Sequence, residues 1–233
     1  MISKKNILSF LEIVLSSLKS DLDDTKIKQS FLVNIDDNED CANKFIAWLP
    51  KIKEELANDL DFFMQSDPAA NSPLEVELTY PGYLAITYYR IAHSLVKLGY
   101  HIEARIISET VHSLTGIDIH PGAQIASPFF IDHGTGIVIG ETAVVGKHCK
   151  IYQGVTLGAL SLSKGSALKG VKRHPTIGDD VTIYSGASIL GNVTIGSNVT
   201  IGSNVFLLED VPSNMKVTLS KPVLVMKEKG EAR

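Results

Sequence analysis

An acid and an imidazole stand side by side at Asp132-His133, followed by Gly134-Thr135-Gly136. A carboxylate beside an imidazole is the arrangement that general-base chemistry needs, because the acid fixes the ring tautomer and stabilises the imidazolium that forms in the transition state. His133 is therefore the first candidate for a base. Asp118 lies 15 residues earlier. A coil of three six-residue repeats would place its carboxylate one rung from His133, about 4.8 Å away.

Three further polar segments could carry chemistry. The first is Asp118 to Pro121, which contains His120, and the second is Arg173-His174-Pro175. The third is a loop, Ala159 to Lys172, that carries three lysines: Lys164, Lys169 and Lys172. A histidine in a turn can also be a hydrogen-bonded corner residue, and His120 could cap the first corner, so these motifs alone leave both roles open.

These segments interrupt a six-residue repeat that must position them. An aliphatic residue returns at every sixth place, with a two-residue slip after position 137 and a gap from Gly158 to Thr176. Because six is even, each return presents the same face of an extended chain, whereas a helix would repeat at three and four. Such a period predicts a parallel β-helix whose rungs bury the aliphatic lane by stacking. The lane is Ile119, Ile125, Ile131 and Ile137, then Ile139, Val145, Ile151 and Leu157, then Ile177, Ile183, Ile189, Ile195, Ile201 and Leu207.

The N-terminal half has helical spacing of apolar residues instead. We predict helices over 3–20, 39–64, 81–98 and 101–114, with Pro50 breaking or kinking the second and Gly116 closing the last. Residues 21–38 are polar and acidic and are expected to form a loop. The resulting organisation is a helical N-terminal domain (1–116), a β-helix (117–211) with an excursion loop at about 158–176, and a C-terminal tail (212–233).

Composition excludes some classes of partner. The chain has 233 residues, 44% of them hydrophobic, and a net charge of −4, which gives no excess of positive charge to bind nucleic acid. No run approaches the roughly 20 apolar residues that span a bilayer, and no signal peptide precedes the first helix. We therefore expect a cytoplasmic protein without a membrane or nucleic-acid partner. Cys41 and Cys149 are interpreted as small core residues.

Taken together, the motifs DIHPGA at 118–123, IDHGTGIVIGETAVV at 131–145, GVTLG at 154–158 and RHPTIG at 173–178 resemble serine O-acetyltransferases. The resemblance covers about residues 67 to 210. It implies an α+β protein in which an N-terminal α-helical domain precedes a left-handed parallel β-helix of hexapeptide repeats. It also implies a homotrimer or a dimer of trimers, with active sites between neighbouring solenoids.

The same resemblance assigns roles to the polar residues. His133 would be the general base that takes the proton from the serine hydroxyl, with Asp118 as its carboxylate partner, and His174 would help to position the substrate. Arg173 would pair with the serine carboxylate, and Asp67 and Asp132 would receive its amino group. A zwitterionic amino acid needs one cation and at least one anion to hold it, which agrees with this set.

The implied reaction transfers acetyl from acetyl-CoA to L-serine, giving O-acetylserine and CoA in the first step of cysteine biosynthesis. It needs no metal, because a thioester is already activated. Small residues, Ala159, Ser185 and Ser203, would line a groove for the pantetheine arm, and the loop lysines could attract the CoA phosphates. Cysteine is a common feedback inhibitor in the family. The chain ends at Arg233 without the terminal isoleucine that many members insert into a cysteine-forming sulfhydrylase, so that complex is not expected.

Three other functions remain open at this stage. A hexapeptide-repeat acyltransferase acting on a sugar or another small acceptor would share the base but not the Asp67, Asp132 and Arg173 set. A zinc carbonic anhydrase would need three convergent histidines, for which His120, His133 and His148 are the candidates. A non-catalytic scaffold would not need Asp118 and His133 in register.

Overall fold

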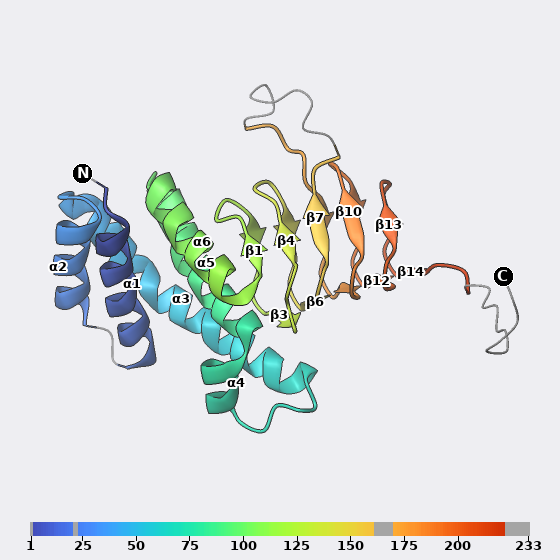
Figure 1. The fold of residues 1–233 in the computed structure, drawn as a ribbon, viewed down its shortest axis with the longest axis horizontal. Coiled ribbons are helices and arrows are strands. Elements are labelled where there is room, and N and C mark those ends of the chain that lie inside the picture. Colours follow the sequence, from blue (N-terminus) through green and yellow to red (C-terminus); the bar gives the residue numbers. More distant parts are fainter. Residues whose placement is uncertain (1, 21–22, 161–169, 222–233) are drawn as a thin grey trace, which may run out of the picture.

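The computed structural model describes residues 2–20, 23–160 and 170–221. A helical part packs against one end of a stack of short parallel strands (Figure 1). The helices are α1 (Lys4–Lys19), α2 (Asp24–Asn34), α3 (Glu39–Ser66), α4 (Pro73–Thr79), α5 (Pro81–Lys97) and α6 (His101–Thr115). The strands are β1 (Asp118–Ile119), β2 (Gln124–Ile125), β3 (Phe129–Asp132), β4 (Val138–Ile139), β5 (Val144–Val145), β6 (Cys149–Tyr152), β7 (Thr156–Gly158), β8 (Thr176–Ile177), β9 (Thr182–Ile183), β10 (Ser188–Leu190), β11 (Thr194–Ile195), β12 (Thr200–Ile201), β13 (Phe206–Leu207) and β14 (Lys216–Val217).

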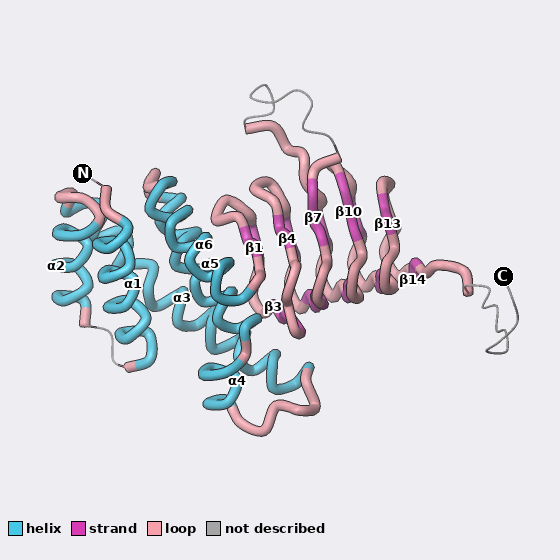
Figure 2. The backbone as a smooth tube through the Cα atoms, viewed as in Figure 1, coloured by secondary structure: helices cyan, strands magenta, loops and turns pink. Residues whose placement is uncertain are grey.

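The strands form three parallel sheets, one for each side of the solenoid. Sheet A contains β1, β4, β7, β10 and β13; sheet B contains β2, β5, β8 and β11; sheet C contains β3, β6, β9, β12 and β14. Successive rungs are visible as short strands separated by turns (Figure 2). The aliphatic lane is buried throughout, as are the residues two places before it. The prediction of helices followed by a parallel β-helix of hexapeptide repeats is confirmed.

The length of each rung explains the interruptions in the repeat. Asp118 pairs with Val138, so the first coil takes 20 residues, whereas Val138 pairs with Thr156 after 18. The two extra residues lie in the corner after Asp132. The next coil, from Val144 to its partner Thr176, takes 32 residues because it contains the excursion. Sheet C gains its last strand, β14, within the segment expected to be a tail.

The prediction of a loop over 21–38 is wrong, because α2 occupies 24–34. The Asp23 carboxylate caps this helix by accepting from the Lys26 N–H, and Ile27 and Phe31, one helical turn apart, are fully buried. The prediction that Pro50 ends or kinks the second helix is not met by any break in assignment: α3 runs unbroken over 28 residues. Burial of Leu49 and Ile52 on either side offsets the lost hydrogen bond.

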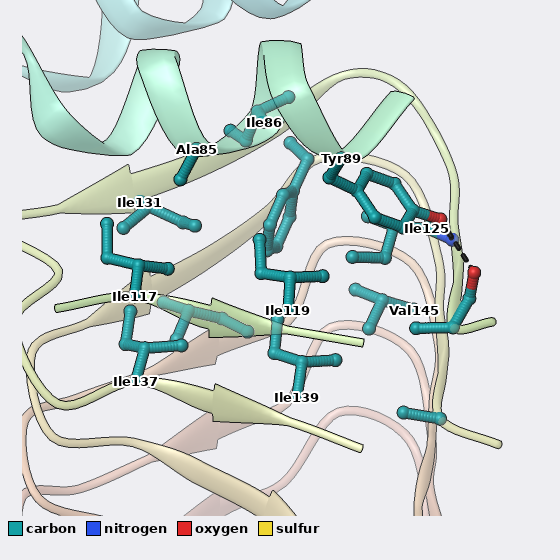
Figure 3. Packing of buried hydrophobic residues seen from close by; sticks show 14 of the residues in the cluster. Ala85, Ile86, Tyr89, Ile117, Ile119, Ile125, Ile131, Ile137, Ile139 and Val145 are labelled. Carbon is teal, nitrogen blue, oxygen red and sulfur yellow. Dashed lines mark hydrogen bonds between the residues drawn. The ribbon is translucent and has the colours of Figure 1, made fainter. Parts of the chain in front are cut away.

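Helix α5 joins the helices to the first coil of the solenoid. The Tyr89 hydroxyl donates to the Ala123 carbonyl at 2.7 Å and accepts from the Ile125 N–H at 3.0 Å (Figure 3). Around it, Ala85 and Ile86 pack over the aliphatic lane (Figure 3). No helix in the described ranges is long and apolar enough to cross a membrane.

A buried ion pair strengthens the same junction. The Arg90 guanidinium donates to both carboxylate oxygens of Asp59, at 2.6 and 2.8 Å. Asp59 also accepts from the Phe129 N–H at 2.9 Å and from the Ser127 hydroxyl at 3.0 Å. Asp59 is 0% exposed, so α3, α5 and the first coil meet at a carboxylate that has no access to water.

Asp59→Ala is expected to lower the free energy of unfolding by about 3–5 kcal/mol, because it leaves the Arg90 cation buried and unpaired. Glu55 is the matched control. It contacts the same guanidinium at 3.2 Å, but its side chain is 29% exposed, so Glu55→Ala should cost about 1 kcal/mol or less. Urea unfolding followed by circular dichroism measures both. Equal losses in the two variants would contradict the assignment of the buried pair as the main contact.

Candidate active site

The polar residues singled out from the sequence lie mainly along two edges of the solenoid. The C/A edge is the column of corners that join a strand of sheet C to the next strand of sheet A; it carries His133, Ser185 and Ser203. The A/B edge is the column that joins sheet A to sheet B; it carries His120, Ala159, Arg173 and His174. The excursion leaves and rejoins the solenoid at the A/B edge.

His133 stands out from the C/A edge. Its side chain is 72% exposed and its backbone has a φ of 56°, so the imidazole projects from the longer corner. The next residue must be glycine, because a Cβ on Gly134 would lie 2.4 Å from the Ile117 side chain. The His133 Nε2 lies 3.7 Å from an Asp132 carboxylate oxygen. An exposed imidazole next to an acid is available to a bound substrate.

The carboxylates of Asp67 and Asp132 lie in one neighbourhood. Asp67 accepts from the Tyr80 hydroxyl at 2.7 Å, and this bond, helped by burial and by the charge of Asp67 itself, raises the pKa of Tyr80 to about 12; the charge of Asp132 also contributes. Burial, followed by the charges of Asp132 and Asp67, raises the pKa of Tyr152. Two carboxylates that act on the same phenols create a negative site suited to an ammonium group.

Two tyrosines extend this neighbourhood along sheet C. Tyr152 pairs in register with Asp132, and its ring stacks on that of Tyr184 with centroids 5.0 Å apart. Sequence analysis missed Tyr80 and both of these residues. The 20-residue length of the first coil is the signal that would have placed Tyr152 beside Asp132, and it was read only as a slip.

Asp118 makes no hydrogen bond or ion pair with His133 among the described residues. Its carboxylate lies with the side chains of Glu109 and His112, each offering one atom within 4.8 Å of the others. The corner that carries His133 nevertheless rests on the residues just before Asp118, since the Gly136 N–H donates to the Gly116 carbonyl at 2.8 Å. Asp118 and His133 therefore belong to adjacent levels of the solenoid.

On the A/B edge, Arg173 forms an ion pair with Glu141, and this contact lowers the pKa of the Glu141 carboxyl. The neighbouring His174 is buried, and its Nδ1 accepts from the Thr142 N–H at 3.1 Å. Glu141 and Thr142 were not singled out from the sequence. They lie one coil before Arg173 and His174, and the intervening excursion hides that relation.

The small residues proposed for a groove divide between the edges. Ser185 and Ser203 stack on the C/A edge, with their hydroxyls 3.3 Å apart, while Ala159 follows β7 on the A/B edge. Lys164 and Lys169 lie outside the described residues. The Lys172 ammonium donates to the carbonyls of Thr142 and Pro175, at 2.6 and 3.1 Å, so this lysine holds the return of the excursion to the solenoid.

The three histidines considered for zinc do not converge. His120 lies on the A/B edge, His133 on the C/A edge, and His148 on the remaining edge, between β5 and β6. Tetrahedral zinc needs ligands about 2 Å from one point. This trio cannot supply that geometry within one chain.

The same division separates the candidate base from the candidate cation. Sheet A lies between the two edges, and one six-residue repeat spans roughly 15–20 Å. An amino acid is several times shorter than that distance. His133 and Arg173 of a single chain therefore cannot contact the same small substrate.

Comparison with known proteins gives a consistent set of relatives. A family described as bacterial transferase hexapeptide (six repeats) matches residues 174–208. A plasmid serine acetyltransferase of Synechococcus elongatus is 53% identical over 172 residues, which is 72% of this chain and 54% of the relative. The serine acetyltransferase of Bacillus subtilis is 46% identical over 157 residues, which is 67% of this chain and 70% of the relative. The chain thus spans about half the length of the first of these relatives.

Solved structures extend the comparison to the fold. Serine acetyltransferase isoform 3 from Entamoeba histolytica, in complex with cysteine, has a TM-score of 0.77 at 42% identity, with 88% of this chain and 72% of that chain covered. Neisseria gonorrhoeae serine acetyltransferase in complex with serine has a TM-score of 0.69 at 36% identity, with 80% of this chain and 74% of that chain covered. The shared region includes both the helices and the solenoid.

Proposed function

The chain belongs to the serine acetyltransferase family, and from this premise we propose that it transfers the acetyl group of acetyl-CoA to the hydroxyl of L-serine. The products are O-acetylserine and free CoA. The observation that carries the proposal is the exposed His133 imidazole beside the Asp67 and Asp132 carboxylates. That arrangement offers a base and an ammonium site in one place.

In the proposed mechanism, Asp67 and Asp132 hold the amino group of L-serine so that its hydroxyl faces His133. The imidazole takes the hydroxyl proton as the oxygen attacks the thioester carbonyl. The tetrahedral intermediate then collapses, breaking the carbon–sulfur bond, and the proton passes to the departing thiolate of CoA. Arg173 binds the serine carboxylate through guanidinium donors additional to those it directs at Glu141.

We propose a homotrimer in which the C/A edge of one chain faces the A/B edge of the next. The separation of His133 from Arg173 and His174 across sheet A supports this arrangement, because only a second chain brings the two sets to one serine. Such a head-to-tail contact closes into a ring when the rotation is one third of a turn. A pair of trimers would use other surfaces.

Acetyl-CoA would lie in the groove between the two edges. Ser185 and Ser203 on one chain and Ala159 on the next have short side chains that allow the pantetheine arm to approach the backbone. L-cysteine would occupy the serine position as an inhibitor, since it has the same amino and carboxylate groups. Its presence in the Entamoeba histolytica complex supports this proposal.

A thiol-release assay tests the proposal directly. With acetyl-CoA, the protein should release free thiol in the presence of L-serine, and more slowly or not at all with homoserine or with a panel of sugars. Added L-cysteine should raise the apparent KM for L-serine. Turnover with a sugar but not with L-serine would replace this function by that of another hexapeptide acyltransferase.

A further inference from the structure

We propose that Thr142 is a positioning residue that holds the His174 ring in one tautomer, so that Nε2–H is a fixed hydrogen-bond donor to an anionic oxygen of the acceptor. The inference deepens the proposed function and rests on it for the identity of the acceptor. Thr142 lies in the corner after β4, and His174 lies in the corresponding corner before β8. The two are 32 residues apart in sequence.

The contacts of the Thr142 hydroxyl use all of its hydrogen-bonding capacity. Its oxygen accepts from the backbone N–H of Arg173 at 3.0 Å and of His174 at 3.1 Å. It also lies 2.8 Å from the His174 Nδ1. A hydroxyl has one donor and two acceptor sites. With both acceptor sites filled, the remaining O–H must donate to Nδ1.

The backbone of Thr142 gives the same answer independently. Its N–H donates to the His174 Nδ1 at 3.1 Å. A ring nitrogen that accepts hydrogen bonds carries no proton, so the proton of the neutral ring is on Nε2. Nε2 makes no hydrogen bond within the described residues. The free donor of the ring is therefore the atom on the side away from Thr142.

Gly140 fixes the other side of the imidazole. A Cβ at this position would lie 2.1 Å from both Cδ2 and Nε2 of His174, so the ring occupies the space that any other residue would fill. Thr142 binds one edge of the ring while the Gly140 backbone faces the other. The ring is held in both position and tautomer.

The charges around the ring keep it neutral. Burial is the main influence, and the cations of Arg173 and Lys172 act in the same direction, together with His120, while Glu141 opposes them. Together they lower the pKa of His174 to about 4. A neutral ring with a fixed Nε2–H can donate a hydrogen bond at neutral pH. It is not suited to take up a proton, which leaves that task to His133.

Thr142→Val removes the hydroxyl and keeps the shape of the side chain. Two backbone N–H groups next to the site then lose their acceptor, and we expect kcat/KM for L-serine to fall by about tenfold to a hundredfold. The KM for acetyl-CoA should change little. Thr142→Ser restores the oxygen and should remain within about threefold of the unsubstituted protein.

Thr87→Val is the matched control, because the Thr87 hydroxyl donates only to the Tyr83 carbonyl of its own helix and is similarly half-buried. Its activity should match that of the unsubstituted protein, and urea midpoints of all three variants check folding. A Val variant with unchanged kcat/KM, or a Ser variant as impaired as the Val variant, would overturn the proposal.

The tautomer can be measured without turnover, so this test does not depend on the identity of the acceptor. In protein labelled with 15N-histidine, with the His174 signals assigned through His174→Gln, the ring should show protonated Nε2 and unprotonated Nδ1. The pattern should persist from pH 6 to pH 8. Protonation at Nδ1, or titration in this range, would overturn the proposal even if L-serine is the acceptor.

Discussion

Replacing His133 with asparagine is expected to lower kcat by about 10²-fold to 10⁴-fold, the usual contribution of a general base. The serine hydroxyl is a weak nucleophile unless its proton is removed as it attacks. Asparagine is chosen because His133 has a φ of 56°, a left-handed conformation that asparagine tolerates better than alanine. The loss should appear in thiol release at saturating L-serine and acetyl-CoA.

His148→Asn provides an unusually close control. His148 also has a φ of 56° and also lies near an acid, with Nδ1 3.7 Å from Asp180. It lies on the edge between β5 and β6, where its ring packs against Phe62. This variant should keep normal turnover. If His133→Asn retained more than about a tenth of the activity, another group would have to act as the base.

The core of the solenoid was predictable because each rung obeys the same local rule. A residue such as Ile183 is buried for the same reason as Ile151 and Ile201, with which it stacks. The polar residues stood out because they break that rule. His133 lies in the corner that adds two residues, and Arg173 and His174 lie where the excursion ends.

The contacts of these residues were not predictable, because they depend on pairs far apart in sequence. Thr142 and His174 are 32 residues apart, and Asp59 and Phe129 are 70 apart. Asp67 looked like the end of a helix, and its bond to Tyr80 depends on the missed helix α4 between them. Assignment of residues to edges failed for a related reason, since the excursion disturbs the count of six. The expected cytoplasmic location stays a prediction.

Mixing two impaired variants should restore activity, because the proposed site takes its residues from two chains. His133→Asn lacks the base on the C/A edge, and Arg173→Gln lacks the cation on the A/B edge. In randomly mixed trimers, a site is intact when an Arg173→Gln chain supplies His133 and the next chain, His133→Asn, supplies Arg173. That combination occurs at about one site in four, so co-expressed variants should recover roughly a quarter of normal activity.

The recovery should be measured at L-serine concentrations below the normal KM, where loss of the carboxylate partner has its largest effect. Chains with different tags allow mixed trimers to be isolated by two successive affinity steps. Each variant assembled with itself is the control and should remain inactive. Mixed trimers that show no recovery would place both residues in a site built by one chain, which sheet A would then have to span. Recovery in trimers would instead assign every active site to a pair of neighbouring solenoids, with the base and the carboxylate-binding cation on opposite sides of the interface.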